Sequence, residues 1–441
     1  MGNNTSSKGV SAEKGVVARG GLPYEAEDDT DSDMYYESES ETSDGERGGH
    51  GCCSGHRQDP PPTPASHAKL TERTWYQKAK SAYDSLVLAI IRPPRSVYDI
   101  ADLGPDKFNF CGRVYCRRDF TLKNEKGQKL CCSIWEPFEI ERKARELPCV
   151  IYMHGNSSNR REAISQLSLV LSLGVTLCTL DFSGSGKSDG EYVSLGCHEK
   201  DDLQTLIRHL RDSGTTSKIA LWGRSMGAAT ALLHARRDAT LACMICDSSF
   251  SSLVALAENM VEMGRKQGLF APGFVISLAI RFIRSSVLEQ AGFDIYDLNP
   301  AEEAEHSIIP LLLIAAEGDA FIPPSHSQLV YYNYAGPKHA FVVPGDHNSI
   351  RPKKILDNVA IFLANALQIP DENIMPEGLH CIGQPPWLQQ QQVDQSQVFS
   401  PASVKQLSSS HTHDISVGMN KAQQEGTKDK LFNLIGGGSR G

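Results

Sequence analysis

The sequence lacks any run of about 18 apolar residues, the length that an α-helix needs to cross a bilayer. Its longest apolar stretches are Leu86–Ile91 and Leu269–Ile280, and a proline and a glycine interrupt the second. Met1–Gly21 also lacks the apolar core of a secretory signal. We therefore expect no membrane-spanning segment and a location in the cytosol or on the cytoplasmic face of a membrane.

An excess of positive charge is absent as well, so the composition gives no sign of a nucleic-acid partner. The net charge of the 441-residue chain is −9. Residues 1–66 hold 5 Lys/Arg and 13 Asp/Glu, a net of −8, which leaves the remaining chain close to neutral. The acidity belongs to one end of the chain and does not indicate a surface for a cationic substrate.

The 12 cysteines do not follow the pattern of a disulfide framework. Cys149, Cys178, Cys243 and Cys246 each lie in a short apolar run, where cysteine behaves as a small hydrophobic residue. This placement favours a reducing compartment.

Composition divides the chain into three zones. Residues 1–69 form an acidic, Gly- and Pro-containing tail with too few aliphatic residues to offset the entropy of ordering, so we predict disorder there. Residues 370–441, with a Gln run and many serines, are predicted to be a second disordered tail. Residues 70–369 are the expected globular body.

Within the body, short apolar runs alternate with helix-length amphipathic segments, which predicts βαβ units and a mostly parallel sheet covered on both faces. The predicted strands are Leu130–Trp135, Cys149–Met153, Val175–Leu180, Ile219–Trp222, Ala242–Cys246, Leu311–Ala315 and Ala340–Val343. The predicted helices are Glu162–Leu173, His198–Arg211, Ala228–Arg236, Pro324–Tyr334 and Lys353–Leu367. Residues 251–306 interrupt the alternation and predict two or three inserted helices, a candidate lid.

A candidate nucleophile follows the fourth of these strands. Gly223-Arg224-Ser225-Met226-Gly227 has the form G-x-S-x-G, with an apolar strand before it and a small-residue helix start after it. In this context the serine occupies a sharp strand-to-helix turn, where neighbours larger than glycine would clash. We predict that Ser225 is a nucleophile.

A serine nucleophile needs a general base, and the base needs an acid that orients it. Asp319 follows one downstream strand and His347 follows the next, in the chain order Ser, Asp, His. Both positions lie just past the carboxyl ends of strands, where α/β sheets build their sites. We predict His347 as the base and Asp319 as the acid, with Glu317 and Asp346 as alternative acids.

Two backbone amides are expected to stabilise the oxyanion. One belongs to Met226, directly after the nucleophile. The other is assigned to Asn156, in the turn His154-Gly155-Asn156-Ser157 that follows the strand Cys149–Met153. The resulting acyl-enzyme mechanism requires no metal and no organic cofactor.

These motifs, together with Asp181-Phe182-Ser183-Gly184-Ser185-Gly186-Lys187-Ser188, resemble the α/β-hydrolase superfamily. Within it the chain is similar to the serine aminopeptidase-like and monoglyceride lipase-like branch, which is related to the α/β-hydrolases that remove palmitate from proteins. The similarity covers roughly residues 85–369. It implies an eight-stranded sheet and the same triad, but it does not specify the substrate.

Three other motifs carry less weight. The segment Gly184–Ser188 is not a phosphate loop, because Asp181 stands where that motif needs glycine. Residues 29–40 lack the turn glycine and the bidentate glutamate of a calcium loop. The segment His50–His56 holds two cysteines and two histidines, which are compatible with zinc, with reversible acylation of Cys52 and Cys53, or with no special role.

The amino terminus fits the N-myristoylation pattern, with Gly2 as acceptor. Because one myristoyl chain anchors a protein only marginally, a second signal is required. Acylation of Cys52 and Cys53 would supply it, and so would the segment Lys69–Arg95, unless that segment is a helix packed against the body. The partner predicted from this pattern is a membrane surface.

Three functions remain open from the sequence. The first is a hydrolase of acyl esters or thioesters, on lipid or acylated protein. The second is a peptidase that cleaves short peptides from the amino end, with Glu258 or Glu262 binding the substrate ammonium group. The third is a non-catalytic scaffold, which has no need of a complete triad.

Overall fold

The computed structural model describes residues 77–78, 80–81, 83–266, 268 and 272–391. The predicted amino-terminal tail, with the lipidation sites Gly2, Cys52 and Cys53, lies outside the described residues, and so do residues 392–441. Within the described ranges, no helix has the length and apolarity of a membrane span.

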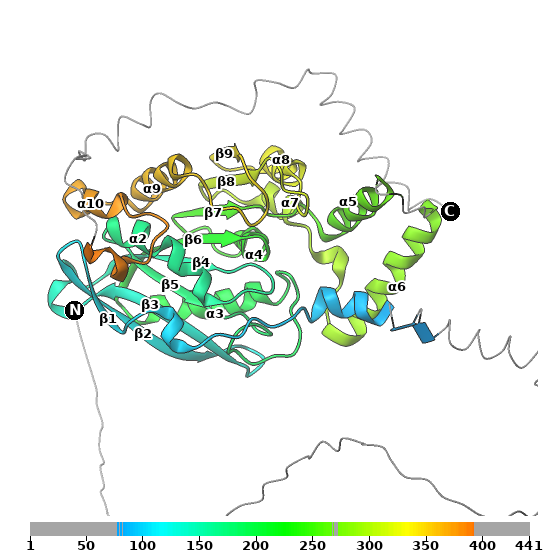
Figure 1. Cartoon of the computed structure of the whole chain (residues 1–441), viewed down its shortest axis with the longest axis horizontal. Coiled ribbons are helices and arrows are strands. Elements are labelled where there is room, and N and C mark those ends of the chain that lie inside the picture. Colours follow the sequence, from blue (N-terminus) through cyan, green and yellow to red (C-terminus); the bar gives the residue numbers. More distant parts are fainter. Residues whose placement is uncertain (1–76, 79, 82, 267, 269–271, 392–441) are drawn as a thin grey trace, which may run out of the picture. The chain divides into compact units, whose positions relative to one another are not determined.

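A nine-stranded sheet forms the centre of the described part of the chain (Figure 1). The strand order is β1-β2-β3-β5-β4-β6-β7-β8-β9. The last six strands of this order pair in parallel, while β1, β2 and β3 pair antiparallel, β3 with β5 as well as with β2. The strands are β1 (Lys107–Phe110), β2 (Arg113–Lys123), β3 (Lys129–Pro137), β4 (Leu147–Met153), β5 (Thr176–Leu180), β6 (Thr216–Arg224), β7 (Cys243–Asp247), β8 (Leu311–Ala316) and β9 (Lys338–Val343).

The seven predicted strands are β3 to β9, but the expected number of eight is wrong, since the described residues form nine. The two strands that the apolar runs did not reveal are β1 and β2. They form a hairpin at the edge of the sheet through Cys111 and Gly112, both with positive φ, as in a two-residue hairpin turn. Because β2 is half exposed and carries charged residues, it has no continuous apolar run.

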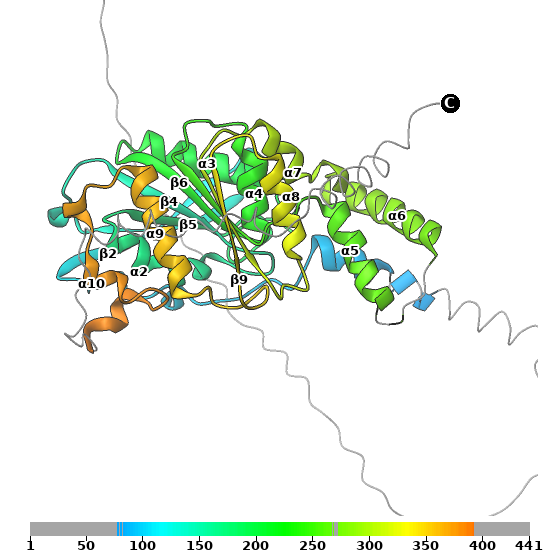
Figure 2. The same ribbon diagram turned by 90° about the horizontal axis from the view of Figure 1, so that it is seen from above.

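Helices cover both faces of the sheet (Figures 1 and 2). Helices α2 (Ile164–Ser172) and α9 (Lys353–Leu367) share one core cluster with Val150 and Tyr152 of β4. The other cluster contains the alternate residues of β4 and side chains from α3 (Glu199–Asp212), α4 (Met226–Ala235) and α8 (Pro324–Asn333). Burial on both faces explains why the central strands are continuously apolar.

Residues 251–306 form the predicted helical insertion between β7 and β8. It contains α5 (Leu253–Lys266), α6 (Gly273–Ala291), η4 (Ile295–Asp297), α7 (Pro300–Glu303) and η5 (Ala304–His306). Residues 83–91, also helical, pack against it: Val87 and Ile91 share a cluster with Ile280 and Val287 of α6. Within the segment Lys69–Arg95, residues 83–91 therefore form a helix packed on the insertion, one of the two alternatives left open above, and residues 92–95 are not helical.

The buried cysteines lie where the apolar runs placed them. Cys149, Cys178, Cys243 and Cys246 are free and buried in β4, β5 and β7. Burial raises the pKa of the Cys149 and Cys243 thiols to about 12, so both stay protonated and inert at neutral pH.

The globular body extends beyond residue 369, which corrects the predicted boundary of the carboxyl-terminal tail. Residues 370–391 form η6 (Asp371–Asn373), α10 (Pro376–Leu379) and η7 (Pro386–Gln391). Met375 and Leu379 are buried in the core cluster of α2 and α9, and the Trp387 ring packs edge-on against Phe108 of β1. Ile374 is buried in the same cluster, so a few apolar residues attach this mostly polar segment to the body. The remaining 3-10 turns are η1 (Ile100–Leu103), η2 (Glu139–Glu141) and η3 (Arg160–Ala163).

Replacing Leu379 tests this correction. Leu379→Ala removes a buried side chain from the core, so we expect the free energy of unfolding to fall by roughly 2–4 kcal/mol in urea denaturation. The control Leu388→Ala, at a position that is 65% exposed, changes it by less than about 0.5 kcal/mol. Equal stability of the two variants would contradict the packing of residues 370–391 on the body.

Candidate functional site

Ser225 occupies the sharp turn between β6 and α4. Its backbone has φ 53° and ψ −116°, a left-handed conformation that costs a non-glycine residue about 1–3 kcal/mol. Two hydrogen bonds hold it there: the Ser225 amide donates to the carbonyl of Asp247 at 2.8 Å, and its carbonyl accepts from Ala229 at 3.0 Å. The strained turn presents the side chain at the carboxyl end of the sheet.

The two glycines of the motif are required by space. A Cβ atom on Gly223 would lie 2.3 Å from the backbone of Gly227, and one on Gly227 would lie 2.2 Å from the carbonyl oxygen of Met153. Neither has positive φ. Helix α4 therefore approaches the ends of β6 and β4 more closely than any side chain would allow.

The structure brings Ser225, His347 and Asp319 together in one chain of hydrogen bonds. His347 Nε2 lies 3.1 Å from Ser225 Oγ, and His347 Nδ1 lies 2.7 Å from Asp319 Oδ2. With Nδ1–H donating to the carboxylate, Nε2 is free to accept the serine proton. Asp319 and His347 follow β8 and β9, which neighbour each other in the parallel sheet.

Asp319 is the best placed of the three candidate acids. Its burial raises the carboxyl pKa, but the hydrogen bond from His347 and the amides of Ile322 and Phe321 outweigh that effect, so the pKa lies below its usual range. Glu317 is exposed, and Asp346 accepts hydrogen bonds from its own turn, from Asn348 and Ser349. The carboxylate facing His347 is thus ionised at neutral pH.

The two predicted oxyanion donors belong to segments next to Ser225. Met226 begins α4, so its amide is at the amino end of that helix. The turn containing Asn156 is adjacent as well, since a Cβ atom on Gly155 would be 3.6 Å from the Cβ of Ser225. The Gly155 amide donates to Glu162 Oε2 at 3.1 Å, which fixes the turn.

Sequence reasoning missed four charged residues around this site: Glu162, Arg224, Asp247 and Arg351. Arg351 and Asp247 form a buried bidentate ion pair, and Arg224 bonds to the segment that carries His347. Arg224 lies inside the G-x-S-x-G motif and Arg351 lies four residues after His347, so proximity to a motif was the available signal.

The glycine-rich segment after β5 is organised by Asp181. This fully buried carboxylate accepts hydrogen bonds from the Tyr98 hydroxyl and from the amides of Arg160 and Lys187. A Cβ atom on Gly186 would be 2.4 Å from the Asp181 carboxyl group. The glycine therefore lets the loop close around a carboxylate.

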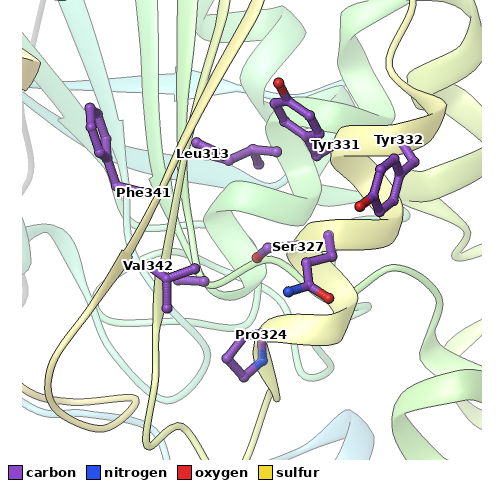
Figure 3. A pocket seen from close by; sticks show the side chains of 10 residues that line it. Leu313, Pro324, Ser327, Tyr331, Tyr332, Phe341 and Val342 are labelled. Carbon is purple, nitrogen blue, oxygen red and sulfur yellow. The ribbon is translucent and has the colours of Figure 1, made fainter. Parts of the chain in front are cut away.

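Two hollows in the described structure are not lined by the three hydrogen-bonded residues. One lies between α8 and strands β8 and β9 (Figure 3) and holds about 10 Å³, room for about one water molecule. Its lining includes Leu313, Tyr331 and Phe341. The other, of about 380 Å³, is lined mainly by polar side chains, which include Ser183, Asp202 and Glu199. Among the described residues, no three His, Cys, Asp or Glu side chains are grouped so as to hold a metal ion.

His326 of α8 links the insertion to the segment after Asp319. The Ser251 amide donates to His326 Nδ1 at 3.2 Å, and His326 Nε2 lies 2.9 Å from the side-chain amide nitrogen of Asn259 in α5. Burial lowers the pKa of His326 to about 4. The ring therefore stays neutral and keeps both contacts with the insertion at physiological pH.

This pKa predicts a pH dependence of stability. Between about pH 6.5 and 4 the unfolded chain protonates His326 and the native state does not, so stability falls as pH falls through that window. Asp202, whose pKa burial raises to about 6, acts in the opposite direction, so the test compares variants. His326→Gln should lose unfolding free energy less steeply than wild type in urea titrations from pH 7 to 4. Parallel curves for the two proteins would contradict the buried neutral ring.

Comparison with known proteins finds sequences and structures that are similar to this chain. Residues 148–288 match the family model described as serine aminopeptidase, S33. The uncharacterized protein YqkD of Bacillus subtilis is 26% identical over 202 residues, which cover 45% of this chain and 64% of YqkD. The match thus spans less than two thirds of that relative's length.

Solved structures with a similar fold include two hydrolases from archaea. The esterase Pf2001 of Pyrococcus furiosus is 21% identical, with 62% of this chain and 98% of that chain covered and a TM-score of 0.45. The acylaminoacyl peptidase of Pyrococcus horikoshii is 18% identical, with 56% and 41% covered and a TM-score of 0.44.

Proposed function

We propose that this chain, an α/β-hydrolase, is a serine hydrolase that cleaves carboxylic esters or thioesters through an acyl-enzyme on Ser225. The observation that carries the proposal is the hydrogen-bonded series Ser225–His347–Asp319, presented by a strained turn. A serine hydroxyl is a weak nucleophile, and an adjacent base oriented by a carboxylate is what activates it.

The mechanism follows from these contacts. His347 Nε2 accepts the hydroxyl proton while Ser225 Oγ attacks the acyl carbonyl carbon, and Asp319 stabilises the imidazolium that forms. The amides of Met226 and Asn156 donate to the oxyanion. His347 then protonates the leaving alcohol or thiol, and water releases the acyl group by the reverse sequence of proton transfers.

The proposed nucleophile can be tested directly. Wild-type protein should react with a fluorophosphonate probe and hydrolyse p-nitrophenyl esters, whereas Ser225→Ala should not label and should lose kcat by about six orders of magnitude. Ser213→Ala serves as a control that labels, because Ser213 is an exposed residue at the end of α3 whose hydroxyl bonds to Leu210 and Thr215. Equal labelling of Ser225→Ala and wild type, or none of wild type, would exclude the mechanism and favour a scaffold.

A serine peptidase is the second candidate, and the match to the serine aminopeptidase model favours it. Its expected ammonium-binding groups, Glu258 and Glu262, are both exposed on α5, and Glu262 pairs with Arg265 at 3.6 Å. Turnover of acyl esters and acyl-thioesters of increasing chain length, compared with aminoacyl p-nitroanilides, separates the two candidates.

We propose that the substrate is reached at a membrane surface, which the outer face of α6 supports. Phe274, Leu278 and Phe282 are 75%, 50% and 57% exposed and recur every four residues, so they form one ridge. The opposite face of α6 packs on the insertion cluster through Ile280 and Val287. A helix that is apolar on both faces needs a second apolar environment.

The amino-terminal lipidation belongs to the same proposal. A myristoyl group on Gly2 anchors a protein marginally, so acyl groups on Cys52 and Cys53 or the α6 ridge act as the second attachment. The protein then lies on the cytoplasmic face of a membrane as a peripheral enzyme.

Removing the aromatic rings of the ridge should weaken membrane binding. The double variant Phe274→Ser, Phe282→Ser loses two side chains that would enter the bilayer, so binding to phosphatidylcholine–phosphatidylserine vesicles should fall at least roughly tenfold in co-sedimentation. Ile140→Ser, at a position in η2 that is 83% exposed, is the matched control and should bind as wild type does. If both variants bind equally, or if only the α6 variant changes the oligomeric state, the ridge is not a membrane contact.

A further inference from the structure

The segment between β9 and α9 carries His347 but has little burial of its own. It follows the last strand of the sheet, and most of its residues are exposed: Gly345, Asp346, Asn348 and Ile350. Apart from an edge-on contact between the imidazole and the Phe321 ring at 5.2 Å, hydrophobic packing gives this segment little support. The carbonyl groups of this segment instead accept hydrogen bonds from two arginines, Arg351 and Arg224.

Arg351 joins this segment to the end of β7. Its guanidinium group makes two 2.8 Å hydrogen bonds to the carboxylate of Asp247, through Nε and Nη2, and both side chains are less than a tenth exposed. Nη1 donates to the carbonyls of Asp346 at 3.1 Å and Ser349 at 3.2 Å, which flank His347. One planar group thus fixes two carbonyls against a carboxylate whose own position is set by the sheet.

Asp247 connects the same ion pair to the nucleophile. Its backbone carbonyl accepts the 2.8 Å hydrogen bond from the Ser225 amide, the bond that helps to hold the strained turn. The carboxylate of this residue holds Arg351 and its carbonyl holds Ser225. A single residue at the end of β7 therefore relates the serine to the histidine segment.

Arg224 forms a second connection from the other side. Its Nη2 donates to the carbonyl of His347 at 3.0 Å and to Asn348 Oδ1 at 2.6 Å. Its Nη1 lies 3.9 Å from Glu162 Oε1, and Glu162 accepts the amide of Gly155 in the oxyanion turn. The residue directly before the nucleophile thereby bonds to the histidine segment and, through Glu162, is connected to the oxyanion turn.

We propose that Arg351, with Asp247, and Arg224 are positioning residues that hold His347 at hydrogen-bonding distance from Ser225. This inference rests on the proposed triad, since it assigns to each arginine the task of placing the general base. Four charged side chains, Glu162, Arg224, Asp247 and Arg351, tie the ends of β4, β6, β7 and β9 together around the reacting atoms. An ion pair that only stabilised the fold would not require hydrogen bonds to the backbone carbonyls of the segment that carries His347, and both arginines make such bonds.

The test must distinguish the loss of a positioning contact from the misfolding that removal of a buried charge can cause. Arg351→Met alone leaves Asp247 buried and unpaired, so the informative variant is Arg351→Met with Asp247→Leu, which replaces the ion pair by apolar side chains of similar volume. Arg224→Met and Arg351→Lys are examined alongside it. The matched control is Arg117→Met in β2, another buried arginine that binds two carboxylates, Asp106 and Asp119, remote from the site.

Two readouts distinguish positioning from stability. In ester hydrolysis, the apolar pair and Arg224→Met should lower kcat about 100-fold while KM stays within about threefold, because the base and not the substrate is displaced. In proton NMR, the low-field signal of His347 Nδ1–H, assigned by its loss in His347→Gln, should broaden or vanish. Arg351→Lys, which keeps the positive charge, should retain part of the wild-type kcat and part of the low-field NMR signal. Arg117→Met should retain the wild-type kcat.

The outcomes separate this inference from the proposed function. A folded apolar pair with wild-type kcat and an unchanged low-field signal overturns the positioning role and leaves the triad intact. If wild type itself hydrolyses nothing, the proposed function fails, and the NMR signal alone decides whether the arginines place His347. If Arg117→Met lowered kcat by the same factor, the loss of activity would be explained by general destabilisation, and the positioning role of Arg351 and Arg224 would be overturned.

Discussion

The close approach of α4 to the ends of β4 and β6 is the constraint on which the site depends. It exists because Gly223 and Gly227 carry no side chain, and any Cβ there would overlap backbone atoms. The approach forces Ser225 into the left-handed region, a conformation that its bonds to Asp247 and Ala229 maintain. Without the two glycines the helix would move outward, and the hydroxyl group would no longer meet the imidazole of His347.

The parallel sheet brings the other groups to the same edge. The strands β4, β6, β8 and β9 run in one direction, so the loops that follow them gather at their carboxyl ends. Asn156, Ser225, Asp319 and His347 each follow one of these strands within a few residues. Residues that are far apart in the chain thus meet, because each of them lies only a few positions after the carboxyl end of a strand.

This logic explains which features the sequence predicted. Strands buried on both faces are continuous apolar runs, so β3 to β9 were recognised, and the fold and the chain order of the three polar residues followed from them. The hairpin of β1 and β2 was missed because β1 is a short edge strand and β2 is only partly buried, so neither forms a continuous apolar run. Residues 370–391 were missed because their few buried apolar residues, among them Met375 and Leu379, stand in a short segment of mostly polar composition next to the Gln run.

The charged residues around the site were unpredictable for a different reason. Arg351 and Asp247 are 104 positions apart, and neither belongs to a motif that implies the other. A buried ion pair is recognisable only when both partners are located in space, since each alone reads as a surface charge. The contacts of Arg351 and Asp247 reach both the segment that carries His347 and the turn that carries Ser225. The three hydrogen-bonded groups follow different strands, and we propose that the charged side chains around them maintain their alignment. In this fold the sheet determines which loops meet, and the arginines determine how closely the imidazole approaches the hydroxyl group.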